Sequence, residues 1–128
     1  MKPHREFHPV SQDGWYRPTG MPDGFLEKVL SDDLDLAAGT GSRTVLQRLA
    51  PGTATDEVVT HETSEEVYVA EGDLIVGSTR GPDGRTDQGG QRFDAPTYAC
   101  RPAGVRHGPF RTEGGCLLIA FFYPTPAS

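Results

Sequence analysis

The chain has 128 residues and a mass of 13.8 kDa, which is the size of a single domain. Its 12 Lys and Arg residues against 18 Asp and Glu residues leave a formal net charge of −6 at pH 7, and no basic run is present, which argues against a nucleic-acid-binding protein. No stretch approaches the run of about 18 apolar residues that a membrane-spanning helix needs. The 16 glycines and 11 prolines lie between short apolar segments, which indicates many turns and a β-rich domain.

Residues 1–24 are rich in proline, glycine and charge, and they are predicted to form an extended arm. The pair Trp15-Tyr16 supplies the only large apolar side chains of interest in this arm. The first residues lack the apolar segment of a secretory signal, so a cytoplasmic protein is expected. Residues 25–128 are predicted to form one barrel domain.

Short apolar segments bounded by turn residues follow the arm at regular spacing, a pattern typical of strands. Strands are expected, in chain order, at residues 25–30, 42–49, 58–61, 65–70, 74–78, 97–101, 106–112 and 116–123. Glu71-Gly72-Asp73 is predicted to turn a hairpin between two of them. Residues 79–91 are almost wholly polar and are predicted to form a loop, either a simple connector or a lid. Short strands without a helical period favour an all-β sandwich or barrel.

The last expected strand, residues 116–123, is apolar on both faces. Such a strand needs cover on both sides, because an exposed apolar run of this size would be a sticky patch. Either the arm or a second subunit supplies that cover, and a homodimer is the favoured interpretation. Cys100 and Cys116 are too few for a disulfide framework and are expected to pack as small apolar groups.

Two histidines lie beside turn residues at the ends of expected strands. His61 is followed four residues later by Glu65, which enters the next strand. Pro102-Ala103-Gly104 reverses the chain shortly before His107. Two imidazoles and one carboxylate are a ligand set of mononuclear Fe(II), Mn(II), Ni(II) and Zn(II) sites.

These two segments resemble the two signature motifs of the cupin superfamily. The latter part of the first motif reads His, three residues, Glu, six residues, Gly, and His61, Glu65 and Gly72 match it. The second motif reads Pro-x-Gly, two residues, His, and residues 102–107 match it in full. The resemblance extends over residues 44–123.

The resemblance implies an all-β double-stranded β-helix, a jelly-roll barrel. It further implies one divalent transition metal (Fe, Mn, Ni or Zn) held inside the barrel by His61, Glu65 and His107. Small cupins are commonly dimers, which agrees with the doubly apolar last strand.

The sequence departs from the motif at Val59, which stands where the first motif has its leading histidine. Val59 shares a strand face with His61 by the two-residue period, so a bound metal would have three protein ligands and positions open to water or substrate. Glu57 lies on the same face and is a candidate substitute ligand. Tyr68 and Tyr98 are candidates for either dimer packing or substrate contact, and Arg111 is a candidate clamp for an anionic group. The candidate substrate-binding residues are therefore Glu57, Val59, Tyr68, Tyr98 and Arg111.

Three hypotheses for the function are considered. The first is a metal-dependent enzyme that acts on a small organic carbonyl or enol substrate, as an oxygenase or a cyclase. The alternative is a non-catalytic module that binds a small ligand or a metal, and a purely structural dimer is a third reading. The sequence identifies no catalytic residue. The expected partners are a small molecule and a second copy of the chain, with no nucleic acid and no membrane.

Overall fold

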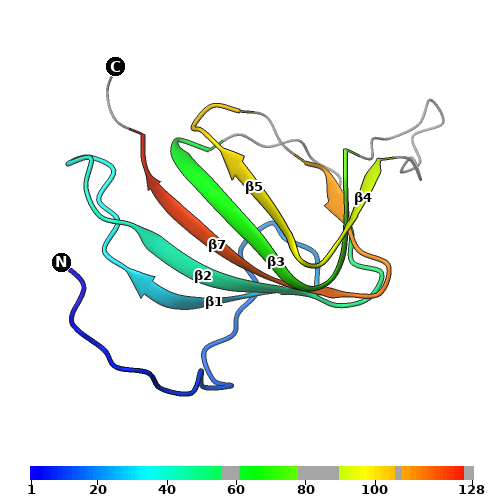
Figure 1. Cartoon of the computed structure of the whole chain (residues 1–128), viewed down its shortest axis with the longest axis horizontal. Helices are drawn as coiled ribbons and strands as arrows, with labels where there is room; N and C mark the ends of the chain where they lie inside the picture. The colour runs from blue at the N-terminus through cyan, green and yellow to red at the C-terminus, as the bar shows by residue number, and fades with distance from the viewer. Residues whose placement is uncertain (56–60, 78–89, 106–107, 126–128) are drawn as a thin grey trace.

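The computed structural model describes residues 1–55, 61–77, 90–105 and 108–125, and every structural statement below concerns these residues. The described chain is all β, as the sequence predicted (Figure 1). Its strands are β1 (Phe25–Asp32), β2 (Arg43–Leu49), β3 (Thr63–Val76), β4 (Gln91–Asp94), β5 (Thr97–Arg101), β6 (Phe110–Arg111) and β7 (Cys116–Pro124). None of the described segments forms a helix long and apolar enough to cross a membrane.

Two antiparallel sheets share the long strand β3. Strands β1, β2, β7, β3 and β5 lie side by side in a curved sheet, in that order (Figure 1). The second half of β3 pairs with β4 and β6 instead. β3 thus passes from one sheet into the other and holds the two together.

The passage between the sheets occurs at Gly72. The register between β3 and β7 shifts between Val69 and Glu71, and Gly72 has a positive φ of 85°. A Cβ atom at Gly72 would lie 1.9 Å from the carbonyl oxygen of Gly115, so only glycine fits this position. The predicted hairpin at Glu71-Gly72-Asp73 is therefore wrong: these residues bend one continuous 14-residue strand.

The other differences from the predicted strands have local causes. β4 begins at the last residue of the expected loop. The strand was not predicted, because Phe93 is the one apolar residue among its four. β6 is only two residues long and begins directly after Pro109, which has no N–H for a ladder bond. Most of the strand expected at 58–61, nearly all of the loop expected at 79–91 and residues 106–107 lie outside the described residues.

The core lies between the inner faces of the strands. Its buried side chains come mainly from alternate positions of β2, β3 and β7, as the two-residue period of a strand requires. The buried core residues are Phe25, Val45, Leu49, Val67, Val69, Leu74, Cys116, Leu118 and Ala120. Cys116 packs as predicted, whereas Cys100 is exposed, because Ala99 occupies the inward position of β5.

The N-terminal arm is attached to the free edge of β1. Tyr16 and Glu27 exchange two backbone hydrogen bonds of 2.9 and 2.8 Å, as in an antiparallel pair. The neighbouring Trp15 ring lies 4.8 Å from the guanidinium carbon of Arg48, within cation–π range. In Figure 1 the residues before this contact run along the outside of the domain.

We expect Gly72→Ala to destabilise the fold by more than about 2 kcal/mol, because the left-handed backbone and the contact with Gly115 both oppose a side chain. Gly52→Ala is the matched control: Gly52 has a similar φ of 82°, but nothing lies within 4 Å of its Cβ position. Chemical denaturation of both variants measures the difference. Equal losses of stability would contradict the close approach at Gly72.

Candidate functional site

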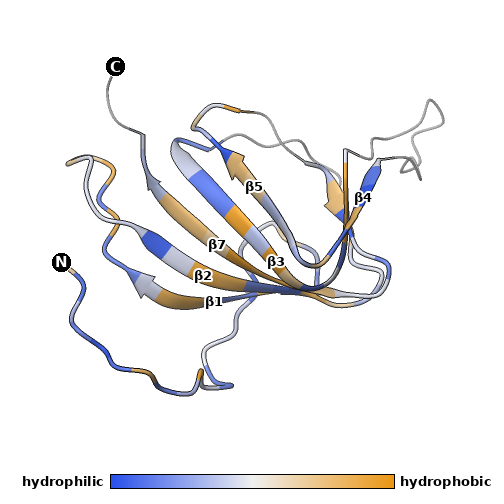
Figure 2. Cartoon of the chain, viewed as in Figure 1, coloured by the Kyte–Doolittle hydropathy of each residue, from blue (hydrophilic) through white to orange (hydrophobic). Residues whose placement is uncertain are grey.

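A cavity of about 560 Å³ lies against the inner face of the curved sheet. The strand register arranges its wall in rows that run across β2, β7, β3 and β5. The rows are Arg43–Phe122–Glu65–Arg101, then Val45–Ala120–Val67–Ala99, then Gln47–Leu118–Val69–Thr97. The charged row therefore lies at the end of the sheet where β2 and β3 begin, and the rows after it are mainly apolar. Figure 2 shows the same change from polar to apolar along the first residues of β2 and β3.

Glu65 is the most enclosed charged group at this end of the cavity. It is only 6% exposed, and its two carboxylate oxygens have different partners. Arg101 donates from Nη1 to Oε1 of Glu65 at 3.2 Å, while Nε2 of His61 lies 3.4 Å from Oε2. Burial raises the pKa of the Glu65 carboxyl above its usual value, and the charges of Arg101 and His61 offset only part of that rise.

Both the ring and the backbone of His61 make contacts that position this residue. The ring meets the Phe122 ring edge-on at a centroid distance of 5.8 Å. The backbone carbonyl of His61 accepts a 3.0 Å hydrogen bond from the N–H of Gly104. This bond brings the turn of the second motif, Pro102 to Val105, directly beside the first.

The donor atoms of His61 and Glu65 fit a shared metal ion. Two ligand atoms about 2.1 Å from one ion in a tetrahedral arrangement are about 3.4 Å apart, which is the separation of His61 Nε2 and Glu65 Oε2. Across the described ranges, no group of three or more His, Cys, Asp or Glu side chains is close enough to hold a metal. His107, the third predicted ligand, lies outside those ranges, as do Glu57 and Val59.

Of the remaining predicted substrate contacts, Tyr98 alone is a lining residue of this cavity within the described ranges. Tyr68 projects from the outer face of the sheet and is not among the residues that line the cavity. Tyr98 lies opposite it on β5, borders the cavity and donates a hydrogen bond from its hydroxyl to Glu66. Arg111 lies on β6, where its Nη1 is 3.4 Å from a carboxylate oxygen of Glu113.

A second polar group at the cavity wall was not singled out by the sequence. Glu27 of β1 is 5% exposed, and its Oε1 accepts a 2.9 Å hydrogen bond from Nε2 of Gln47. Its Oε2 accepts hydrogen bonds from Arg43 Nη2, at 2.9 Å, and from the hydroxyl of Tyr16. Strand alternation could have identified Glu27 from the sequence, because Glu27 follows Phe25 by two residues and so shares its inward face.

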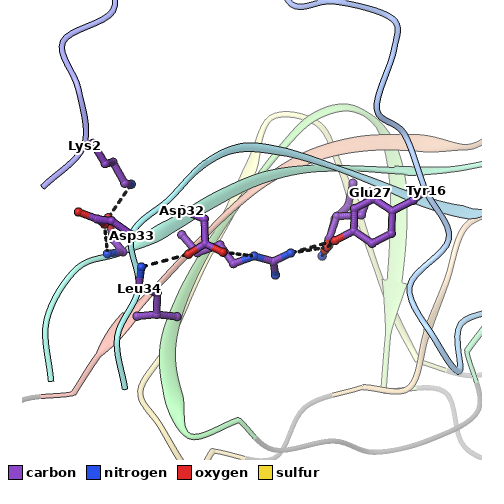
Figure 3. A network of polar contacts seen from close by, with 9 residues as sticks. Lys2, Tyr16, Glu27, Asp32, Asp33 and Leu34 are labelled. Atoms are coloured by element: carbon purple, nitrogen blue, oxygen red, sulfur yellow. Dashed lines mark hydrogen bonds and ion pairs between the residues drawn. The ribbon is translucent and has the colours of Figure 1, made fainter. Parts of the chain in front are cut away.

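Arg43 is the centre of this second group, and Figure 3 shows its partners Tyr16, Glu27 and Asp32. Its Nη2 also donates to the Tyr16 hydroxyl at 2.9 Å, and its Nε lies 3.4 Å from Oδ2 of Asp32. Burial by itself would lower the pKa of Arg43, but the contacts with the Glu27 carboxylate and with Tyr16 outweigh this effect. The pKa is therefore raised above its usual value, and the guanidinium stays charged. Burial and the hydrogen bond to Glu27 both raise the pKa of Tyr16, so the phenol stays protonated.

No protein-family model matches the sequence, and no curated protein does. Solved structures do resemble it. An acetylacetone dioxygenase from Acinetobacter johnsonii superposes with a TM-score of 0.68 at 20% identity, over 96% of this chain and 76% of that one. An RmlC-like cupin from Shewanella frigidimarina gives 0.66 at 22% identity, over 98% and 96% of the two chains. A sugar phosphate isomerase of the cupin superfamily from Silicibacter pomeroyi gives 0.57 at 28% identity, over 81% and 62%.

These similarities extend over most of the chain and confirm the fold that the two sequence motifs implied. The chain therefore has the fold of the cupins.

Proposed function

We propose that the protein is a metal-dependent cupin enzyme that acts on a small carbonyl or enol compound, as an oxygenase or a cyclase. The observation that carries the proposal is the convergence of His61 Nε2 and Glu65 Oε2 at the charged end of a 560 Å³ cavity. The structural likeness to an acetylacetone dioxygenase supports this substrate class. A non-catalytic module that binds a small ligand or a metal is the alternative.

In the proposed site, His61, Glu65 and His107 hold one divalent transition metal. Such an ion polarises a carbonyl oxygen as a Lewis acid, and iron would in addition provide redox chemistry with dioxygen. Arg101 occupies Oε1 of Glu65 and thereby leaves Oε2 directed toward His61. The Phe122 ring orients the imidazole and, together with the valines of β3, keeps that side of the cavity apolar.

Metal analysis tests the proposed ligands. We expect about one transition metal per chain in the purified protein, and a large loss of it in Glu65→Gln and in His107→Ala. Glu65→Gln keeps the shape of the side chain and an oxygen atom that accepts from Arg101. It replaces the anionic carboxylate by a neutral amide, which is a weaker metal ligand. Plasma mass spectrometry of protein grown with several metal supplements gives the content.

His8→Ala is the control for this experiment, because His8 lies exposed in the arm and does not line the cavity. An unchanged metal content in both Glu65→Gln and His107→Ala would show that the ligands are other residues. Wild-type protein without transition metal under every supplement would favour the non-catalytic module.

We also propose that a second copy of the chain covers the outer face of the curved sheet. Leu46, Ile119, Tyr68 and Tyr98 form a row across β2, β7, β3 and β5 on that face. Tyr98 is 60% exposed, and Phe121 beside this row is 42% exposed. A contiguous aromatic patch of this kind is typical of an interface.

Light scattering tests the dimer. We expect wild-type protein to be a dimer and Ile119→Asp to give monomers or aggregates, because the new carboxylate would be buried without a partner. Leu36→Asp is the control, since Leu36 is an exposed apolar residue that lies in the turn between β1 and β2 and not in the row of residues across the sheet. A soluble dimer for Ile119→Asp would exclude this face as the interface.

A further inference from the structure

We propose that Arg43 is a substrate-binding residue that donates a hydrogen bond to a carbonyl oxygen at the far end of an uncharged substrate. This inference rests on the proposed function, because it assigns the substrate's other end to His61 and Glu65. Arg43 is then the polar group opposite the predicted metal ligands, and it selects a neutral carbonyl compound.

Arg43 lines the same cavity, and one of its guanidinium nitrogens has no hydrogen bond among the described residues. Its Nη2 and Nε are engaged by Tyr16, Glu27 and Asp32. Its Nη1 forms no hydrogen bond within the described part of the chain, and it is not among the buried atoms there that lack a partner. Arg43 lines the cavity, so this accessible N–H edge is available to an oxygen atom of a ligand.

The three partners hold the guanidinium in one orientation before a ligand arrives (Figure 3). A planar guanidinium with contacts on two of its nitrogens cannot rotate without breaking them. Glu27 is itself fixed by Gln47 of β2. Binding at Nη1 therefore costs little ordering of the Arg43 side chain.

Register sets the distance between the two ends of the site. Arg43 and Glu65 are both paired with Phe122, from opposite sides, so their backbones lie two strand spacings apart, roughly 9–10 Å. Phe122 fills the position between them, and Leu118 and Val67 lie in the adjoining rows. A substrate that reaches both ends has a polar group at each end and an apolar middle.

Charge selects an uncharged substrate. Arg43 is in contact with two carboxylates, those of Glu27 and Asp32, so this corner carries a net negative charge. A substrate carboxylate would be repelled there, whereas a neutral carbonyl oxygen accepts from Nη1 without that penalty. Arg101 and Glu65 also compensate each other's charge at the other end of the cavity.

Three probes with the same diketone group test the proposal by calorimetric titration. Methyl 4,6-dioxoheptanoate carries a further neutral carbonyl, nonane-2,4-dione replaces it by methylenes, and 4,6-dioxoheptanoate replaces it by an anion. We expect the methyl ester to bind wild-type protein about tenfold more tightly than nonane-2,4-dione, which is the contribution of one good hydrogen bond. The anion should bind more weakly than the ester.

Arg43→Lys is the informative variant. It keeps a positive charge beside the buried Glu27 but loses the guanidinium fork, so the preference for the ester over nonane-2,4-dione should disappear. Arg48→Lys is the matched control, because Arg48 lies on the same strand, faces outward beneath Trp15 and should leave the preference unchanged.

The affinity of the ester relative to nonane-2,4-dione is measured with the metal-free and with the metal-loaded protein. A failure of metal binding is then distinguished from a failure of this proposal. Loss of the ester preference in Arg43→Lys alone supports the proposal in either state. Absence of the preference in wild-type protein, its survival in Arg43→Lys, or tighter binding of the anion than of the ester overturns it. Failure of all three probes to bind overturns the proposed substrate class as well.

Discussion

Two carboxylates lie inside the sheet's concave face, and each is held by a guanidinium from a neighbouring strand. Burying an unpaired carboxylate costs several kcal/mol, so Glu27 and Glu65 are tolerated there only with Arg43 and Arg101 beside them. Register sets one of these pairs, since Glu65 lies directly opposite Arg101. Glu27 instead lies opposite Gln47, and Arg43 reaches it from farther along β2. The two acidic and two basic side chains in the described wall of the cavity thus balance, and Asp32, which contacts Arg43 from outside that wall, adds one negative charge.

The two pairs differ in what they leave available. Arg101 engages one oxygen of Glu65, and the other oxygen remains directed at His61. At Glu27 the reverse holds: both carboxylate oxygens are engaged, and it is the guanidinium of Arg43 that keeps an accessible edge. One end of the cavity therefore offers oxygen and nitrogen donors that suit a cation, and the other offers N–H groups that suit an oxygen acceptor. A single extended molecule can satisfy both ends only if its own two ends differ in chemistry.

Alternation and turn chemistry predicted an all-β domain, and the resemblance of two motifs to those of the cupins implied the jelly-roll fold. The same motifs predicted that His61 and Glu65 lie close together, as they do. Reasoning from turn residues failed at Gly72, because a glycine between two apolar runs is typical both of a hairpin turn and of a bend in a continuous strand. Only the packing of β7 against this residue distinguishes the two. For a related reason, Arg43 was not singled out. Both faces of β2 mix polar and apolar residues, so periodicity alone does not say which face is inside.

The bend at Gly72 also explains why the two ends of β3 have different surroundings. Beyond it, β3 leaves the curved sheet and pairs with β4 and β6, which brings Leu74 into the core. Asp73 closes this region by accepting hydrogen bonds from the backbone N–H groups of Glu113 and Gly114. Burial alone would raise the pKa of Asp73, but these N–H groups and nearby positive charge lower it, so the carboxylate remains ionised as a fixed clasp between β3 and the turn before β7. At the opposite end, β3 pairs with β7 and β5 among the described strands, and its buried charge there is held by the ion pair of Glu65 with Arg101 rather than by backbone N–H groups.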